Sequence, residues 1–390
     1  MNDVLKKWTS QKCFFILFVT SLLISYQNFQ QREYGWDMPG YIGSYLLAEN
    51  SVAKEQIREK VYSVIKSEAP AFQYDKMVGF HQEGSWNDYI SKNSEAFNLQ
   101  IPYYSIKVFY VFLIFCFHHL GFSLPTAVFL PNIVSFFIFS FLLYYIFKEI
   151  IKDKLLLALI LTLIIILLPP FRYLASIPSP DMLAVLLLSW FAYAVVKKYR
   201  FYVQFMILML AIFTRPDLII FALTYLVAFF LFDFYRKRKI NWFSVGYLIV
   251  MLGTYLLILN INHYPGWKDV FYDTFIHRRK MITGNADFTF QEYWQIVVKN
   301  LVNFKKITCI AAVFLLTVFY ISKDVWIKSL AAFIFLNIYL KFAFFPAPGE
   351  YRFFIGFLLL LFMVALYVTK DKIRNFPFQL KQKYPRKINR

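Results

Sequence analysis

The most prominent feature of this sequence is a series of long apolar stretches separated by short polar connectors. About 20 consecutive apolar residues cross a bilayer as an α-helix. Eleven stretches approach that length: 13–29, 103–120, 124–147, 155–171, 180–196, 201–214, 217–234, 240–262, 302–321, 326–345 and 352–369. The pattern predicts an all-α polytopic membrane protein, with residues 1–390 forming a single membrane-embedded domain and no separate soluble domain.

Basic connectors indicate the orientation, because cytoplasmic loops of membrane proteins carry the excess of Lys and Arg. The N-terminal segment and the tail at 370–390 are both basic, so we expect both in the cytoplasm. Further basic connectors lie at 148–154, 197–200, 236–239 and 323–328. Two cytoplasmic ends require an even number of crossings, and working back from the tail assigns the non-crossing stretch to 103–120.

The stretch 103–120 is therefore predicted to start and end on the outer side. It contains Lys107, His118 and His119, which suit an interfacial or re-entrant helix better than a lipid-exposed span. The prediction becomes about ten transmembrane helices plus one embedded juxtamembrane helix on the outer face. His118 and His119 are a weak candidate for a metal site, because neighbouring residues on a helix point in different directions.

This topology gathers the residues capable of chemistry on the outer face. A first outer loop with juxtamembrane helices covers 30–102, and a second outer loop covers 263–300. Short turns at 176–181, 214–217 and 345–352 lie on the same face, whereas the inner face receives only basic connectors. We expect a multi-pass protein of the bacterial cytoplasmic (inner) membrane whose active site faces outward.

Composition excludes an ordinary soluble domain, since 59% of residues are hydrophobic and the mean hydropathy is +0.51. The formal charge of +19 would suggest nucleic acid in a soluble protein, but here the basic residues follow the orientation pattern of membrane loops, so we expect no nucleic-acid partner. Cys13, Cys116 and Cys309 lie in apolar stretches without ligand-like spacing, which is typical of cysteines that act as small hydrophobes rather than as disulfides or metal ligands.

Asp37 follows the first apolar stretch directly, in a segment rich in aromatic residues, glycine and proline. Irregular backbone at membrane depth survives only where it is buried in protein or lines a cavity. An ionisable group there is a functional hypothesis by default. The structural alternative is that Asp37 caps the next helix or pairs with Arg32.

Two further carboxylates, Asp181 and Asp217, follow prolines at predicted helix N-termini on the same face. Exposed N–H groups and the helix dipole favour an acid at such a position, which is a complete structural explanation for each residue alone. Together with Asp37 they would form an acidic outer pocket.

Four arginines accompany these acids at the outer helix ends and in the second loop: Arg215, Arg278, Arg279 and Arg352. Arginine binds phosphate through two parallel hydrogen bonds. Basic residues outside oppose the usual bias, so an anionic ligand would explain them. The alternatives for the run at 277–280 are an ordinary solvated charge cluster or attraction to anionic lipid headgroups.

A carboxylate beside a phosphate-binding patch fits one reaction well. The carboxylate takes a proton from an acceptor hydroxyl, a lipid-linked phosphate leaves a sugar carbon, and arginines neutralise its developing charge. The sequence contains no Gly-Lys-Ser/Thr phosphate loop, Gly-x-Ser-x-Gly elbow or His-Glu-x-x-His motif that would indicate another enzyme class.

The layout resembles the GT-C superfamily of integral-membrane glycosyltransferases, such as protein O-mannosyltransferases and lipid A aminoarabinose transferase. Asp37 matches the position of the family's catalytic aspartate, and 103–120 looks like its juxtamembrane helices. Ser-Pro-Asp at 179–181 is similar to the second acidic position. Arg-Pro-Asp at 215–217 is similar to an Arg-Pro-acid turn of several members, and Glu-Tyr-Arg-Phe at 350–353 to their late turn near the donor phosphate.

The resemblance implies an inverting glycosyltransferase with a polyprenyl-phosphate sugar donor, a glycan, lipid or protein acceptor, and Asp37 as general base. Tyr41, His81 and Glu350 are further candidates for substrate binding. Many members carry two adjacent acids where this chain has Asp37 followed by Met38, so a divalent metal is left open and no cofactor is assigned.

Two other functions remain in view: a transporter or flippase of a lipid-linked oligosaccharide, and a polymerase of an envelope glycan. A transporter is expected to place charges near the bilayer midplane and to show paired halves. Here the charges gather at outer helix ends, which favours the enzyme. The sugar, the acceptor and the oligomeric state cannot be inferred from the sequence.

Overall fold

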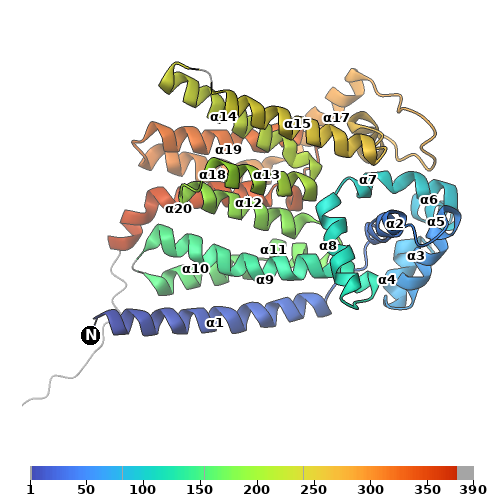
Figure 1. Ribbon diagram of the computed structural model, residues 1–390, viewed down its shortest axis with the longest axis horizontal. Helices are drawn as coiled ribbons and strands as arrows, with labels where there is room; N and C mark the ends of the chain where they lie inside the picture. The colour runs from blue at the N-terminus through green and yellow to red at the C-terminus, as the bar shows by residue number, and fades with distance from the viewer. Residues whose placement is uncertain (1, 81, 153, 240, 376–390) are drawn as a thin grey trace, which may run out of the picture.

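The computed structural model describes residues 2–80, 82–152, 154–239 and 241–375, and within these ranges every regular element is a helix (Figure 1). The first half contains α1 (Asn2–Gln30), α2 (Met38–Glu49), η1 (Lys54–Gln56), α3 (Ile57–Lys66), α4 (Ala71–Val78), α5 (Trp86–Lys92), α6 (Ser94–Gln100), α7 (Pro102–Ser105), α8 (Val108–His119), α9 (Leu124–Ile151), α10 (Leu155–Leu167) and α11 (Pro169–Ser176). The second half contains α12 (Asp181–Val196), α13 (Phe201–Thr214), η2 (Pro216–Leu218), α14 (Ile219–Lys237), α15 (Trp242–Ile261), α16 (Trp267–Phe275), α17 (Phe290–Asn303), α18 (Lys305–Ile321), α19 (Val325–Phe344), η3 (Tyr351–Phe353) and α20 (Ile355–Asn375).

Five helical segments are long and apolar enough to cross a membrane. They are Ser10–Gln30, Leu124–Ile151, Pro216–Lys237, Trp242–Ile261 and Val325–Phe344. The number rises to eight if each of three bent helix pairs counts as one span, and α12 and α13 are shorter apolar helices. The predicted all-α class is thus confirmed, and the helices are compatible with a multi-pass membrane protein.

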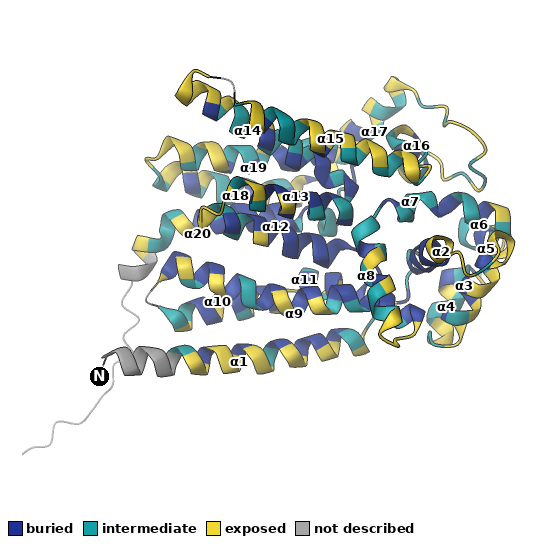
Figure 2. Cartoon of the chain, viewed as in Figure 1, coloured by how far each residue is buried: buried dark blue, intermediate teal, exposed yellow. Residues whose placement is uncertain are grey.

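The bundle is organised around α12, which packs between α9 and α13 and also contacts α20. Its residues from Asp181 to Ser189 are all buried, whereas the outlying α15 is largely exposed (Figure 2). Among membrane helices close van der Waals packing replaces the hydrophobic effect as the source of association. The first half of α12 is buried on every side, so the side chains of its first turn are held in fixed positions.

The short helices α2 to α8 cover one end of the bundle, together with α16 and α17 (Figure 1). The chain bends by 103° between the α6–α7 segment and α8. Residues on either side of α8 contact the first long loop: Lys107, just before α8, donates from Nζ to Tyr41 Oη at 2.8 Å, and Ser123, the N-cap of α9, donates from Oγ to the Glu68 carboxylate. This end of the molecule carries the cavity described in the next section, and we refer to it as the cavity end.

The opposite end carries the start of α1 and the end of α20 (Figure 1). There Lys197 Nζ lies 2.7 Å from Glu149 Oε2, which joins two of the basic connectors. The tail predicted at 370–390 is described only as far as residue 375.

Candidate functional site

A cavity of about 720 Å³ lies at the cavity end, between the bundle and the two long loops. Nearly all candidates from the sequence line it: Asp37, Tyr41, Asp181, Arg215, Asp217, Arg278, Arg279, Glu350 and Arg352. His81 lies outside the described residues. Residues more than 300 positions apart therefore share one space, as the predicted outer-face topology requires.

Asp37 occupies the N-cap position of α2, but its side chain makes no capping hydrogen bond. Arg32, the alternative partner, instead forms an ion pair with Glu68 at 3.4 Å. The Asp37 Oδ1 atom accepts a hydrogen bond of 3.3 Å from Tyr104 Oη, and about a fifth of the side chain stays exposed. Neither structural alternative is found, and the carboxylate faces the cavity.

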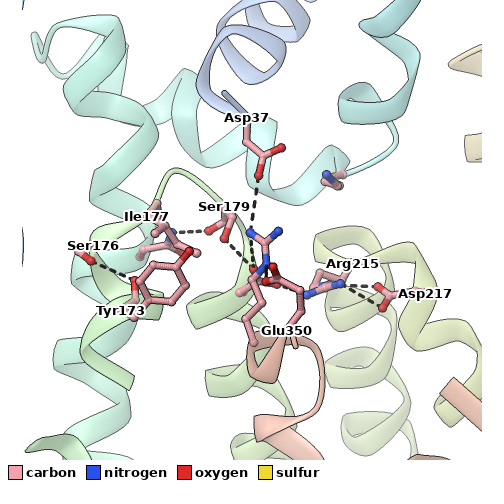
Figure 3. Close-up of polar contacts among 12 residues, drawn as sticks. Asp37, Tyr173, Ser176, Ile177, Ser179, Arg215, Asp217 and Glu350 are labelled. Atoms are coloured by element: carbon pink, nitrogen blue, oxygen red, sulfur yellow. Dashed lines mark hydrogen bonds and ion pairs between the residues drawn. The ribbon is translucent and has the colours of Figure 1, made fainter. Parts of the chain in front are cut away.

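Arg215 connects the other two predicted carboxylates (Figure 3). Its Nη1 atom pairs with Asp181, and its Nε and Nη2 atoms each lie 3.1 Å from an oxygen of Asp217. Lys341, near the end of α19, adds an ion pair of 2.7 Å to Asp217. Ser179 Oγ donates to the second oxygen of Asp181 at 2.8 Å, so this buried acid is fully partnered.

Arg352 extends this set of charges to Asp37. Its Nη1 atom lies 3.7 Å from Asp37 Oδ2 and 3.9 Å from Asp181 Oδ2, and its Nε atom lies 3.0 Å from Glu350 Oε2. Cations and carboxylates thus alternate without a break along the cavity wall. We call this set the charge row: Lys341, Asp217, Arg215, Asp181, Arg352 and Asp37.

A turn of irregular backbone positions the middle of the charge row. Asn132 of α9 donates its side-chain amide to the carbonyls of Ile177 and Ser179. Pro180 then precedes Asp181, the first residue of α12, where the helix N-terminus favours an acid. The sequence pattern that predicted a helix start here is therefore correct, and the tertiary contacts add a partner for each carboxylate oxygen.

Lys107 and Arg278 are the two cavity-lining cations in the described part of the chain that have no carboxylate within 4 Å. The Arg278 guanidinium lies between two indoles, 4.1 Å from the ring centre of Trp36 and 3.5 Å from that of Trp86. Burial lowers the pKa of Arg278, while Tyr104 and Asp37 oppose that shift, and an arginine stays charged throughout. These two residues have donors left for an anion.

Arg279 differs from its neighbour. Its guanidinium bonds Asp269 at 2.7 Å, Asp273 at 2.7 and 2.9 Å, and the carbonyl oxygen of Gly284 at 2.7 Å. Hydrogen bonding to Asp273 raises the pKa of Arg279. Arg279 lines the cavity, but its donors are committed to the second loop, so the geometry does not favour it as a phosphate ligand.

The structure adds three residues that the sequence did not identify as part of the site: Lys107, Tyr104 and Lys341. Lys341 lies within the apolar stretch 326–345, and an ionisable residue inside such a stretch is itself a signal for a buried partner. Lys107 gave the same signal within the apolar stretch 103–120, whereas Tyr104 gave none, because its contact with Asp37 depends on how α7 folds against α2.

A resident metal does not fit the donors present. Each acidic side chain that lines the cavity lies within 4 Å of an arginine or lysine: Asp37, Asp181, Asp217, Asp273 and Glu350. Among the described residues, no group of three or more His, Cys, Asp or Glu side chains is arranged to hold a metal ion. The carboxylate oxygens serve the cations of the protein instead.

No family model, curated protein or solved structure matches this chain. The class that fold and site define is that of an all-helical protein with several helices able to span a membrane and a charged cavity at one end of its bundle.

Proposed function

We propose that this chain is a GT-C-like membrane glycosyltransferase that moves a sugar from a polyprenyl phosphate to an outer-face acceptor with inversion. One observation carries the proposal. The Asp37 carboxylate makes no capping hydrogen bond and lines a cavity of about 720 Å³, which is also lined by Lys107 and Arg278, the two cations without a carboxylate partner among the described residues. General base and anion site are the two parts that this reaction requires.

In the proposed reaction Asp37 accepts the proton of the acceptor hydroxyl. The hydroxyl oxygen forms a bond to the anomeric carbon as the bond from that carbon to the phosphate oxygen breaks. The bonding pair stays on the leaving polyprenyl phosphate. Tyr104 and Arg352 orient the carboxylate from two sides, at 3.3 and 3.7 Å.

Lys107 and Arg278 are our preferred ligands of the leaving phosphate, because their charges are not already matched. Arg215 belongs to the charge row, where it neutralises Asp181 and Asp217. Arg352 also belongs to the charge row, but its side chain lies beside Asp37 and lines the cavity. We therefore assign phosphate binding to Lys107 and Arg278, which have free donors, rather than to Arg215 and Arg279.

The proposed topology has ten crossings, contributed by α1, α9, α10 with α11, α12, α13, α14, α15, α18, α19 and α20. In this arrangement α8 starts and ends on the outer side. The contacts of Lys107 with Tyr41 and of Ser123 with Glu68 support it, because they hold the residues before and after α8 against the first loop. The Lys197–Glu149 pair supports a common inner side for two basic connectors.

The test uses purified protein in lipid nanodiscs with defined polyprenyl-phosphate sugars and a panel of glycan, lipid and peptide acceptors. Asp37→Asn should lower the transfer rate by about 10²- to 10⁴-fold, the range that a positioned general base contributes. The matched control is Asp287→Asn, the same change at an exposed residue of the second loop that does not line the cavity.

Equal transfer rates for Asp37→Asn and the parent would reject the general base. Product analysis separates the other functions: long repeating glycans would indicate a polymerase, and movement of intact donor across the bilayer without sugar transfer would indicate a flippase. Inverted configuration at the transferred sugar carbon is expected.

A further inference from the structure

α17 presents an apolar stripe that the described part of the chain leaves uncovered. Phe290, Trp294, Val298 and Leu301 are exposed by 75%, 57%, 45% and 45%. Their spacing of four, four and three residues places them along one side of an α-helix. We call these four residues the α17 stripe.

A second side of α17 faces the cavity rim. Tyr293 Oη donates to the carbonyl of Ala343 at 3.1 Å, and Asn300 Nδ2 donates to the carbonyl of Pro346 at 2.8 Å. Val297, on the same side, is buried. α17 is therefore fixed to the end of α19 and to the segment that follows it, and the stripe has a defined direction relative to the cavity.

The third side of α17 is exposed and carries the polar residues Gln295 and Lys299, with the exposed Val302 at its end. Lys305 and Lys306 are exposed directly after the helix. Lysines beside an apolar stripe are typical of helices that lie on a membrane surface, where the amines reach lipid phosphates while the apolar side enters the acyl region. Trp294 within the stripe is also a residue type that settles at this boundary.

The geometry of the chain separates α17 from the membrane span. α17 and α18 meet at a bend of 65° next to Phe304. The 17 residues of α18 extend about 25 Å at 1.5 Å per residue. That length covers most of the hydrocarbon thickness of about 30 Å, so α18 alone accounts for most of a span.

We infer that α17 lies in the plane of the bilayer surface at the cavity end, with the α17 stripe inserted below the lipid headgroups. Its partner is a lipid surface, and the exposed lysines around the bend match anionic headgroups in charge. Through Tyr293 and Asn300 the helix holds the cavity rim at headgroup depth. This inference depends on membrane insertion alone and stands whether or not the protein transfers sugars.

Spin labels on the full-length protein can test the inference. In a background with Cys13, Cys116 and Cys309 replaced by alanine, single cysteines are introduced as Trp294→Cys and Val298→Cys in the stripe. Gln295→Cys and Lys299→Cys are the matched controls, one residue further along the same helix. Each variant is labelled with a nitroxide in nanodiscs that contain anionic lipid, and its collisions with oxygen and a water-soluble nickel chelate are measured.

Labels in the stripe are expected about 5–10 Å below the headgroup boundary, and the control labels at or above it. Strong nickel collisions at both pairs would overturn the inference, because the stripe would then face water. Depths beyond this range at both pairs would make α17 part of a transmembrane span. Low collision rates with both reagents in the stripe would mean that protein covers it. If Trp294→Cys is not monodisperse, the Val298 and Lys299 labels decide alone.

Discussion

At Gly40 the absence of a side chain determines where a tyrosine ring can lie. A Cβ atom at this position would come within 2.3–2.5 Å of three ring atoms of Tyr104. The same ring carries the hydroxyl that donates to Asp37. Gly40 and Tyr104 thus belong to one arrangement that orients the proposed general base.

Gly40→Ala should displace the Tyr104 ring and destabilise the protein by about 1–3 kcal/mol, as expected for overpacking in a closely packed region. The measurement is the thermal unfolding temperature in detergent. The matched control is Gly253→Ala in α15, where a Cβ meets nothing within 4 Å. That change should leave stability equal or increased, since alanine favours helix over glycine by about 1 kcal/mol. Equal unfolding temperatures for Gly40→Ala and the parent would contradict the proposed contact.

For single residues, the sequence predicted position better than partner. It indicated which side chains lie near the cavity, but not which other side chains they contact. The placement of Asp37, Asp181 and Arg352 followed from their positions next to apolar stretches. The commitment of Arg279 to Asp269 and Asp273 was not predicted. The two acids are four residues apart on α16, a spacing that shares one helix side, but only the fold of the loop brings Arg279 back to them.

Among the elements, the charge row links the ends of helices that are distant in sequence. Asp181 begins α12, Asp217 lies in η2, Lys341 lies in the last turn of α19 and Arg352 lies in η3. Buried charges are costly unless they are paired. The ion pairs of the charge row therefore hold these helix ends next to one another.

Arg215→Ala should therefore destabilise the protein by about 3–5 kcal/mol, because it leaves the buried carboxylate of Asp181 with the longer contact to Arg352 as its one ion pair among the described residues, beside the hydrogen bond from Ser179. Arg215→Lys keeps the charge but loses the fork, and an intermediate loss is expected. Chemical denaturation in detergent measures the effect, with Arg236→Ala, an exposed arginine of α14, as control. A loss of Arg215→Ala no larger than that of the control would show that the charge row does not contribute to stability.

The second loop docks on the first through Arg278 and its neighbours. Besides the two indoles around Arg278, Trp86 Nε1 donates to the carbonyl of Arg279 at 3.1 Å, and Lys280 Nζ donates to the carbonyl of Gly84 at 2.7 Å. This docking closes one side of the cavity.

Trp36→Leu removes one of the two indoles, and a cation–π contact contributes about 0.5–2 kcal/mol. Hydrogen exchange of the backbone at 276–289 should accelerate by up to about 30-fold, because the free energy of local opening falls by that amount. Trp242→Leu, at an exposed tryptophan of α15, is the control. Unchanged exchange at 276–289 in Trp36→Leu would rule out a role of the indole in holding the loop.

For the whole molecule, hydrophobic length and basic connectors were enough to predict an all-helical class with several helices long and apolar enough to span a membrane. Their division of the charged residues between two sides of a membrane stays a prediction. They could not determine the shape of α10 with α11, which bends by 59° at Pro169 and Pro170. Nor could they reveal the cavity, because its walls come from loops whose contacts are set by side-chain packing rather than by periodicity.

The proposed sidedness can be tested with single cysteines in a cysteine-free background. Phe122→Cys, between α8 and α9, should react with an impermeant thiol reagent in intact cells. Lys152→Cys, at the end of α9, should react only after permeabilisation. Both positions are exposed on the protein surface, so a difference in labelling would report the side of the membrane and not burial. Reaction at residue 152 but not at residue 122 in intact cells would invert the proposed orientation.

The shortness of α8 has a consequence for how the protein is made. Its 12 residues extend about 18 Å, well below the hydrocarbon thickness, although its composition is apolar enough for insertion. In the proposed topology the insertion machinery therefore leaves this segment on the outer side as it emerges. Were α8 taken up as an additional span, every later connector would change sides. Asp37, which precedes α8, would then be separated from Asp181 and Arg352 by the thickness of the bilayer, and the cavity could not assemble.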